Sequence, residues 1–527
     1  MEIHQSVTNL DYTVIIIYIL SVITIGFWVS FRKKESDDIF LAGRSLGWPN
    51  IGLSIFGTNI APSMMIGSCG VAYSTGMVAS NFEWLAWPFL MLMAMVFLPH
   101  YINTKVSTMP QFMLRRYGNK CRNFLSWYAV FTTCVSLGTT LYAGGVLLGQ
   151  ILGWSLIFSI IFLTVIATSF TVAGGLEAVV ITDSFQSILM IVASAALTVI
   201  GLYKVGGISE LVGSVPPDYW QLFRPADDAS YPWPAIVFGY PVMGIWFWCT
   251  NQIIVQRALG GRDVQQGQYG SIFASYLKIL TPLIFFVPGI ICKVLHPDLI
   301  DPDQAYMTMV TTYLPSGMVG LIIAVLIAAL VSTVDSQQNS LSTVFTLDIY
   351  CKLFRPDAGD KEAKFIGRVV TAVSGVVAVV LAILFGQIKD MDLFSLIQSM
   401  IAFMAPSMAV VFLVGVLWKR ANSQAAFTVL VFGNIVSIGI GVCYLAKWPT
   451  GFQWPHFLML SFYLFVGLVV LMIAVSLLTV APSSEYGLPT LRETYSSNGH
   501  SIKSAKTVWF WWIVLLVIMT VIYIIFR

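Results

Sequence analysis

One polar stripe inside a hydrophobic stretch carries the residue types best suited to chemistry. In the segment AALVSTVDSQQNSLST, residues 328 to 343, polar side chains recur every three or four residues: Ser332, Asp335, Ser336, Asn339, Ser340 and Thr343. This spacing places them on one face of a helix. Two interpretations are open. The stripe forms hydrogen bonds between helices of a bundle, or its oxygens bind an alkali cation together with carbonyls of a broken helix.

A second segment supplies such a break. Residues 55 to 67, IFGTNIAPSMMIG, carry Gly57, Thr58, Asn59 and Pro62 in the middle of an apolar span. Irregular backbone at membrane depth persists only where it is buried in protein or lines a polar cavity, because unpaired N–H and C=O groups are costly in hydrocarbon. A broken helix of this kind indicates the binding site of a secondary transporter.

The composition shows what must hold these segments in place. The chain of 527 residues is 57% hydrophobic and 10% charged, against about 25% charged in soluble domains, and its mean hydropathy is +0.82. We predict an all-α polytopic membrane protein with fourteen transmembrane helices. Their expected first residues are Asp11, Trp48, Asn81, Asn123, Trp154, Thr182, Trp233, Ser271, Ser316, Phe365, Asp392, Asn422, Trp454 and Thr507.

The distribution of basic residues gives an orientation. Of the 28 Lys and Arg residues, 21 fall in loops that this topology places inside, Arg257 and Arg262 among them, as the positive-inside rule requires. Both termini are then outside. The net charge of +3 follows from topology, so nucleic acid is not required as a partner. The absence of N-x-S/T sites and of long loops favours a bacterial inner membrane.

Several function classes are disfavoured by what the spans lack. The seven Cys and five His residues show no CxxC, HxxxH or HExxH spacing, so neither a disulfide framework nor a catalytic metal is indicated. An enzyme would require a nucleophile with a neighbouring base, and the spans show no such pair. A channel or a transporter-like sensor is less favoured, because no filter-like repeat and no long signalling domain occur. We expect a small-molecule solute and membrane lipid as partners, with no obligate protein partner evident.

Four ionisable residues fall within or at the edge of spans: Glu83, Asp183, Lys278 and Asp335. Each such residue costs roughly 2.5 to 3.5 kcal/mol at the bilayer centre, which makes it a functional candidate. Structural alternatives remain for three of them. Glu83 could be an interfacial carboxylate, Lys278 could extend its amine to the interface, and Asp183 could be stabilised at a helix N-terminus.

Three ordered motifs resemble the sodium/solute symporter family, nearest its sodium/sugar branch of sodium/glucose and bacterial sodium/galactose cotransporters. They are AGGLEAVVITDSFQ (173 to 186), WFWCTNQIIVQRAL (246 to 259) and LVSTVDSQQNSLSTVFTLDIY (330 to 350). The resemblance covers the chain from about Asp11 to its C-terminus. It implies sodium-coupled import by alternating access, with the sodium ion as the coupling ion.

The resemblance also implies a five-plus-five inverted repeat whose first and sixth core helices are broken at mid-membrane. Within a single transporter domain, 1–527, we expect core repeats at about 48–206 and 233–418. Peripheral helices are expected at 11–30, 422–446, 454–480 and 507–527. The second interruption is expected at the glycines and proline of span seven, Gly239, Pro241 and Gly244, because such residues break helices at corresponding positions of the two halves.

Carried over residue by residue, the family's sodium site would consist of three carbonyls and two hydroxyls. These belong to Gly57, Ile60, Ala329, Ser332 and Thr333. Asp183 matches an aspartate on the inner sodium route. Asp335 has no carboxylate counterpart in the sugar branch, and three roles stay open for it: it assists a second cation, pairs with Lys278, or caps the polar stripe.

The solute pocket departs further from the sugar branch. Residues matching sugar-contact positions are Asn59, Glu83, Lys278 and Gln398, with Ser136 in place of an asparagine, Trp248 beside the gate and Phe247 in place of the gating tyrosine. Three more polar positions carry Met64, Ala86 and Gly244. Fewer polar groups predict a solute other than galactose, since unpaired site groups reject a ligand strongly. We expect a sugar or sugar-like polyhydroxylated solute. The alternative is a carboxylated solute such as a sialic-type acid, amino acid or vitamin, which Lys278 would attract and Glu83 would oppose.

Overall fold

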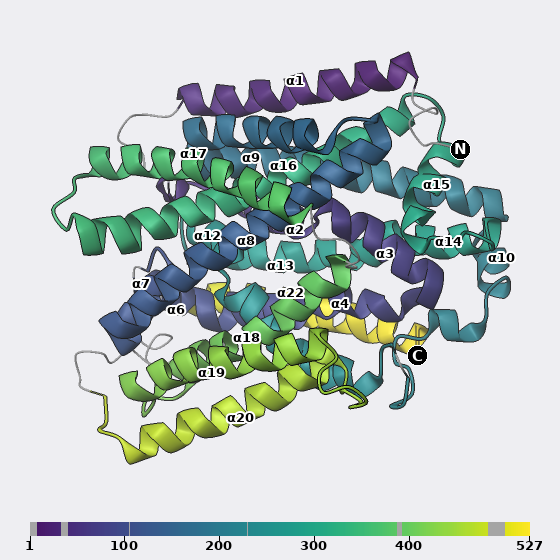
Figure 1. Cartoon of the computed structure of the whole chain (residues 1–527). Helices are drawn as coiled ribbons and strands as arrows, with labels where there is room; N and C mark the ends of the chain where they lie inside the picture. The colour runs from purple at the N-terminus through teal and green to yellow at the C-terminus, as the bar shows by residue number, and fades with distance from the viewer. Residues whose placement is uncertain (1–7, 33–39, 105, 229, 387–392, 483–500) are drawn as a thin grey trace.

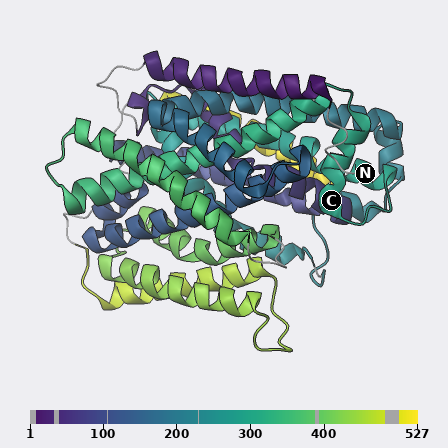
Figure 2. The same ribbon diagram turned by 45° about the horizontal axis from the view of Figure 1, so that its top comes forward.

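The computed structural model describes residues 8–32, 40–104, 106–228, 230–386, 393–482 and 501–527, and their regular secondary structure is helical. The helices run roughly side by side, with α1 (Asn9–Arg32) along one edge of the molecule. Helices α19 (Ser423–Leu445) and α20 (Phe457–Leu478) lie along the opposite edge, as the turned view also shows (Figures 1 and 2).

The remaining helices that position the candidate sites fall into two groups. The first half contains α2 (Trp48–Asn59), α3 (Pro62–Thr75), α4 (Asn81–Trp84), α5 (Ala86–Leu92), α6 (Leu98–Asn103), α7 (Met109–Tyr117), α8 (Asn119–Leu152), α9 (Leu156–Val205) and α10 (Ile208–Gly213). The second half contains α11 (Tyr240–Gly244), α12 (Gln252–Leu259), α13 (Val264–Thr281), α14 (Val287–Leu295), α15 (Ala305–Tyr313), α16 (Met318–Val344), α17 (Asp360–Phe385), α18 (Leu393–Leu417) and α22 (Ser501–Ile525).

Nine helices in the described part of the chain are long and apolar enough to cross a membrane. They are Met64–Ile102, Asn119–Gly149, Gly175–Val205, Val264–Leu295, Met318–Phe354, Asp360–Phe385, Ser423–Leu445, Phe457–Leu478 and Lys506–Ile525. Four shorter apolar helices accompany them: Asn9–Val22, Leu156–Ser169, Ala235–Thr250 and Ile401–Leu417. A multi-pass membrane protein is confirmed, and the count of fourteen spans stays a prediction.

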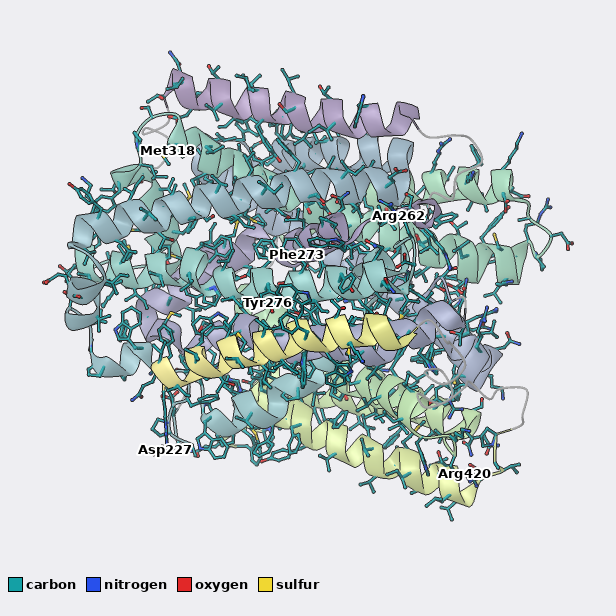
Figure 3. All side chains as sticks on the ribbon, turned by 180° about the vertical axis from the view of Figure 1, so that it is seen from behind. Asp227, Arg262, Phe273, Tyr276, Met318 and Arg420 are labelled. Carbon is teal, nitrogen blue, oxygen red and sulfur yellow. The ribbon has the colours of Figure 1, made fainter. Side chains whose placement is uncertain are left out.

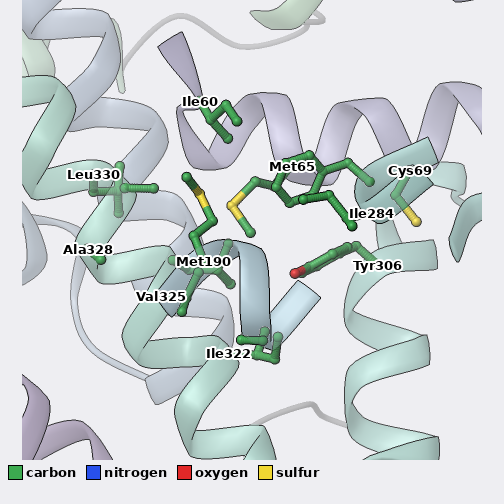
Figure 4. Close-up of a cluster of buried hydrophobic side chains, with 14 of the residues drawn as sticks. Ile60, Met65, Cys69, Met190, Ile284, Tyr306, Ile322, Val325, Ala328 and Leu330 are labelled. Carbon is green, nitrogen blue, oxygen red and sulfur yellow. The ribbon is translucent and has the colours of Figure 1, made fainter. Parts of the chain in front are cut away.

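The polar interruption near Pro62 is a break between α2 and α3. Pro62 is the first residue of α3, and a proline disfavours helical backbone at the residue before it. Ala61 is accordingly extended (φ −78°, ψ 157°), and Ile60 is also non-helical (φ −95°, ψ 87°). The side chain of Ile60 anchors this break in a fully buried cluster. Figure 4 shows it with Met65, Met190, Val325, Ala328 and Leu330.

Helix α9 contains a sharp change of direction at Gly175, where two helices meet. This residue has φ +57° and ψ −155°, a left-handed conformation that glycine adopts without steric cost. The second half of α9, after Gly175, carries Asp183 toward α2 and α16, against which α9 packs.

The second break lies at Asn251, not at the glycines and proline predicted for it. The chain from Ala235 to Thr250 is a continuous run of α- and π-helical turns, and Asn251 is extended (φ −74°, ψ 124°). The Asn251 side chain accepts a hydrogen bond from the Ile253 N–H at 3.0 Å and so caps α12. The glycines serve close packing. A Cβ at Gly239 would lie 2.3 Å from the Leu458 carbonyl oxygen, and one at Gly244 would lie 2.4 Å from the Phe89 ring.

Helix α16 forms the centre of the molecule. It packs against α1, α8, α9 and α17. In its most apolar stretch of 18 residues 89% is buried, against 17% in the corresponding stretch of α22. Its start is tied to α1, because Asp11 Oδ1 accepts hydrogen bonds from the backbone N–H groups of Gly317 and Gly320, both at 2.7 Å. The polar stripe therefore faces protein and not lipid.

Residues that the predicted topology assigns to different sides of the membrane lie at opposite ends of the bundle. In the view from behind, Arg262 and Arg420 lie at one end, and Asp227 and Met318 lie at the other (Figure 3). Helix α22 crosses this face, where the Tyr276 hydroxyl donates to the Trp511 carbonyl at 2.8 Å. Its last turn reaches the loop before α11, because the Leu222 N–H donates to the Phe526 carbonyl at 2.9 Å.

Candidate functional site

A buried polar cluster surrounds Asp183 of α9. Its Oδ2 accepts hydrogen bonds from the Ser54 hydroxyl of α2 at 2.6 Å and the Thr58 hydroxyl at 3.3 Å. Its Oδ1 accepts from the Ser332 hydroxyl of α16 at 2.6 Å. Asp183 is fully buried. The carboxylate therefore joins the first broken helix to the polar stripe.

Arg257 of α12 completes this cluster, which corrects its prediction as a residue of an inside loop. The guanidinium is 1% exposed and lies 3.4 Å from Asp183 Oδ2. It also donates from Nε to the Ser54 hydroxyl at 2.9 Å and contacts the Ser336 hydroxyl. A buried charge requires a partner of opposite sign and hydrogen bonds, and the Asp183 cluster supplies both.

Asp335 lies in the same cluster and away from Lys278. Its Oδ1 accepts a hydrogen bond from Ser336 at 3.4 Å, and the residue is fully buried. Its Oδ2 has no hydrogen-bond partner within the described part of the chain. Of the three roles predicted for Asp335, pairing with Lys278 is wrong.

The predicted sodium ligands lie on two helices that pack together, α2 and α16. Gly57, Ile60, Ala329, Ser332 and Thr333 are all buried. A hydroxyl pair, Thr58 Oγ1 and Ser336 Oγ at 3.3 Å, links the two helices beside them. Their oxygens are engaged within the protein: Gly57 O accepts from the Ile60 N–H at 3.2 Å, and Ala329 O accepts from the Thr333 hydroxyl at 2.8 Å.

Gly57 has a packing role beside its predicted role as a ligand. A Cβ there would lie 2.3 Å from the Ser187 hydroxyl, which donates a hydrogen bond to the Leu53 carbonyl at 2.8 Å. The glycine therefore lets α2 approach α9 closely. This approach brings Ser54 and Thr58 within reach of Asp183.

Three of the predicted solute-contact residues form a second buried polar cluster. Lys278 of α13 donates to Glu83 Oε2 and to Asn59 Oδ1. Its ammonium lies 5.2 Å from the Trp248 ring centroid and 5.8 Å from that of Phe56, within range of cation–π attraction. Lys278 is 1% exposed. It is therefore neither an interfacial nor a lipid-facing amine, and Glu83 is a buried ion-pair partner.

Two other predicted solute-contact residues, Ser136 and Phe247, border a separate cavity of about 230 Å³. Ser136, Phe247 and the predicted sodium ligand Thr333 line it, whereas Asn59, Glu83, Lys278, Met64 and Ala86 do not. Phe247 and Trp248 pack edge to face with centroids 4.8 Å apart. Because Phe247 faces the cavity and Trp248 covers Lys278, this ring pair stands between the two regions. The Gln398 side chain lies outside the described residues.

Sequence reasoning missed Ser54 and Arg257 of the Asp183 cluster and Gln337 of the cavity. Arg257 falls in a loop when basic residues are placed by topology alone. A signal was present, since the seven residues between Cys249 and Arg257 contain no Gly or Pro, which allows Arg257 to lie in a helix. Gln337 falls between the residues of the predicted stripe and yet lines the cavity.

The family model that matches this chain is described as the sodium:solute symporter family and covers residues 39–433. The chain belongs to the sodium:solute symporter family. Curated relatives include a sodium/glucose cotransporter 4 of Danio rerio, 32% identical over 81% of this chain and 71% of the relative. A sodium/mannose cotransporter of Bos taurus is 34% identical over 82% and 79%. A sodium/myo-inositol cotransporter 2 of Oryctolagus cuniculus is 31% identical over 90% and 77%.

Solved structures share the fold of this symporter. A Na⁺-coupled sialic acid symporter in a substrate-bound outward-open state has a TM-score of 0.79 at 23% identity, covering 90% of this chain and all but 1% of the other. Mhp1, a nucleobase-cation-symport-1 family transporter, has a TM-score of 0.56 at 12% identity, with 90% and 98% covered. Sodium is thus the coupling ion, and the predicted family and branch are confirmed.

Proposed function

We propose that this symporter imports a neutral sugar or sugar-like polyhydroxylated solute together with sodium, by alternating access and without a catalytic step. The observation that carries the solute class is the pairing of Lys278 with Glu83 and Asn59. The amine and carboxylate cancel in charge, so the cluster presents directional donors and acceptors with no net charge. The similarity to cotransporters for glucose, mannose and myo-inositol supports this class.

The rival class, a carboxylated solute, is less well supported by the same contacts. Such a solute would need Lys278 free to pair with its carboxylate, and Glu83 already occupies the ammonium. A second carboxylate would add a like charge beside Glu83, which is repulsive in a site of low dielectric.

For sodium we propose the five oxygens of Gly57, Ile60, Ala329, Ser332 and Thr333. Thr333 lines the cavity, which supports sodium release into it. Asp183 accepts a hydrogen bond from Ser332 and is proposed to receive the ion next. Asp335, with its Oδ2 unpaired within the described chain, is proposed to assist this route or a second cation.

The cavity supports an inward-facing state. Its wall includes Met109 and Pro110, next to the basic loop that the sequence places inside. Asn59, Glu83 and Lys278 do not line it, and the last two are buried. We propose that movement of the Phe247–Trp248 pair connects the two regions during transport. The breaks at Ile60 and Asn251 fit a five-plus-five repeat, and fourteen spans with both termini outside complete the proposed topology.

Sodium supplies the energy through its gradient. One charge moving down about 100 mV releases roughly 2.3 kcal/mol, enough for about fifty-fold accumulation of solute. The test uses proteoliposomes loaded with potassium. Uptake of labelled D-glucose, D-mannose, myo-inositol and a sialic acid is compared with sodium or potassium outside. Uptake of a neutral probe only with sodium is expected, whereas sodium-driven uptake of the acid alone would favour the rival class.

A further inference from the structure

The cavity has a polar wall with an unsatisfied buried amide. Gln337 of α16 is 7% exposed, and its Nε2 donates to the Ser136 hydroxyl at 3.0 Å and the Thr140 hydroxyl at 3.4 Å, both on α8. Its Oε1 has no partner within the described chain. Exchanging the amide N and O would leave the nitrogen unpaired instead. Either way a buried polar group lacks a partner, which is unfavourable.

The rest of the lining suits a ligand with polar edges and apolar faces. On α8, Thr132, Thr133, Ser136 and Thr139 all border the cavity, at spacings that put them on one helix face. Aromatic rings, among them Phe247, lie in the same wall. None of the described lining residues is charged. A neutral ligand with several hydroxyls satisfies such a wall.

The size of the cavity restricts this ligand further. Its volume of about 230 Å³ is below the roughly 300–1,000 Å³ of pockets for drug-sized molecules. A monosaccharide or a cyclic polyol is small enough. The site is also distinct from the Lys278 cluster, because the ring pair Phe247–Trp248 stands between them.

We propose that this cavity is a second solute site on the release side, which binds a neutral polyhydroxylated ligand through the free end of the Gln337 amide. The proposal rests on the proposed function for the class of ligand. It adds that solute binds here without sodium, after leaving Asn59, Glu83 and Lys278. Gln337 then determines how long the solute stays before release.

The test is equilibrium binding of labelled D-glucose, D-mannose and myo-inositol to the purified full-length protein in potassium medium. Saturable binding of at least one probe is expected. Gln337→Leu should weaken it about fivefold to tenfold, the equivalent of one or two hydrogen bonds. No saturable binding to the wild type, or affinity of Gln337→Leu within twofold of it, would overturn the proposal.

Gln338→Leu is the matched control. This neighbouring buried glutamine bonds to Thr168 of α9 at 2.8 Å and does not line the cavity. The affinity of Gln338→Leu for the probe should therefore equal that of the wild type. An equal loss in both variants would assign the effect to α16 packing and contradict the proposal. Should Gln337→Leu fail to fold, Thr133→Val removes a hydroxyl of the same wall with little change in shape. It should weaken binding about threefold, and unchanged binding would overturn the proposal.

Glu83→Gln separates this site from the proposed function. It should lose sodium-driven uptake and keep the binding measured in potassium. If the wild type shows no sodium-driven uptake of any neutral probe, the proposed function fails, whatever the potassium binding shows. If uptake is present but potassium binding is not, only the release-side site fails.

Discussion

Arg257 Nη2 lies 3.4 Å from Asp183 Oδ2 in a fully buried ion pair. This pair joins α12, which follows the second helix break, to α9. The Ser54 hydroxyl bridges the two charges, and Ser332, a predicted sodium ligand, bonds to the other Asp183 oxygen. The two broken elements and the proposed sodium site thus share one polar network.

Arg257→Met should destabilise the protein strongly, because it leaves Asp183 buried without its charged partner. Breaking a buried pair in this way costs about 3–5 kcal/mol. The measurement is the thermal melting temperature of the purified protein. Arg262→Met is the control, since Arg262 is exposed and bonds to the Ser45 carbonyl. Equal melting temperatures for the two variants would refute a stabilising role of the pair. Adding Asp183→Asn to Arg257→Met should recover part of the loss.

Ser332→Ala combined with Thr333→Ala should raise the sodium concentration for half-maximal uptake. Loss of two oxygen ligands is expected to raise it about tenfold or more, at about 1.4 kcal/mol per decade. The control is Ser342→Ala, a buried serine on the same helix whose hydroxyl bonds to the Gly367 carbonyl at 2.7 Å. The sodium assignment is wrong if the double variant and the control have the same sodium dependence.

Lys278→Met should abolish solute uptake and lower the melting temperature, because Glu83 is then a buried carboxylate without its partner. The double variant Glu83→Gln with Lys278→Met should melt at a higher temperature than Lys278→Met alone, since it removes both charges. Uptake should be absent in both. Wild-type uptake by Lys278→Met, or no recovery of stability in the double variant, would argue against the pairing.

Gly244→Ala tests whether this glycine serves packing. The added Cβ would lie 2.4 Å from the Phe89 ring, so we expect a loss of about 1–3 kcal/mol, as in other overpacked cores. Gly439→Ala in α19 meets no atom within 4 Å and should be neutral or stabilising by up to about 1 kcal/mol. The melting temperatures of the two variants measure these effects. If Gly244→Ala melts at the wild-type temperature, the packing role of Gly244 is wrong.

The sequence predicted the features that depend on local chemistry. The break before Pro62 follows from the restriction that proline places on Ala61. The buried stripe of α16 follows from the cost of polar groups in hydrocarbon. The site residues divide into two regions, which sequence spacing does not reveal, because Lys278 and Glu83 meet only when α13 packs against α4.

Other features depend on contacts between distant segments. Gly239 and Gly244 look like helix breakers by type, yet their neighbours Leu458 and Phe89 make them packing residues. Arg257 looks like one more basic loop residue until Asp183 and Ser336 surround it. In each case the partner lies far away in sequence, so no local pattern identifies it.

Sodium-driven uptake of a neutral polyhydroxylated solute is the most direct test of the account. Proteoliposomes containing the wild-type protein are loaded with potassium, and initial uptake of labelled D-glucose, D-mannose and myo-inositol is measured with sodium or potassium outside. At least one probe should accumulate with sodium outside, and Ser332→Ala with Thr333→Ala should remove this advantage at low sodium. Equal uptake of every probe in the two media would contradict sodium-coupled import.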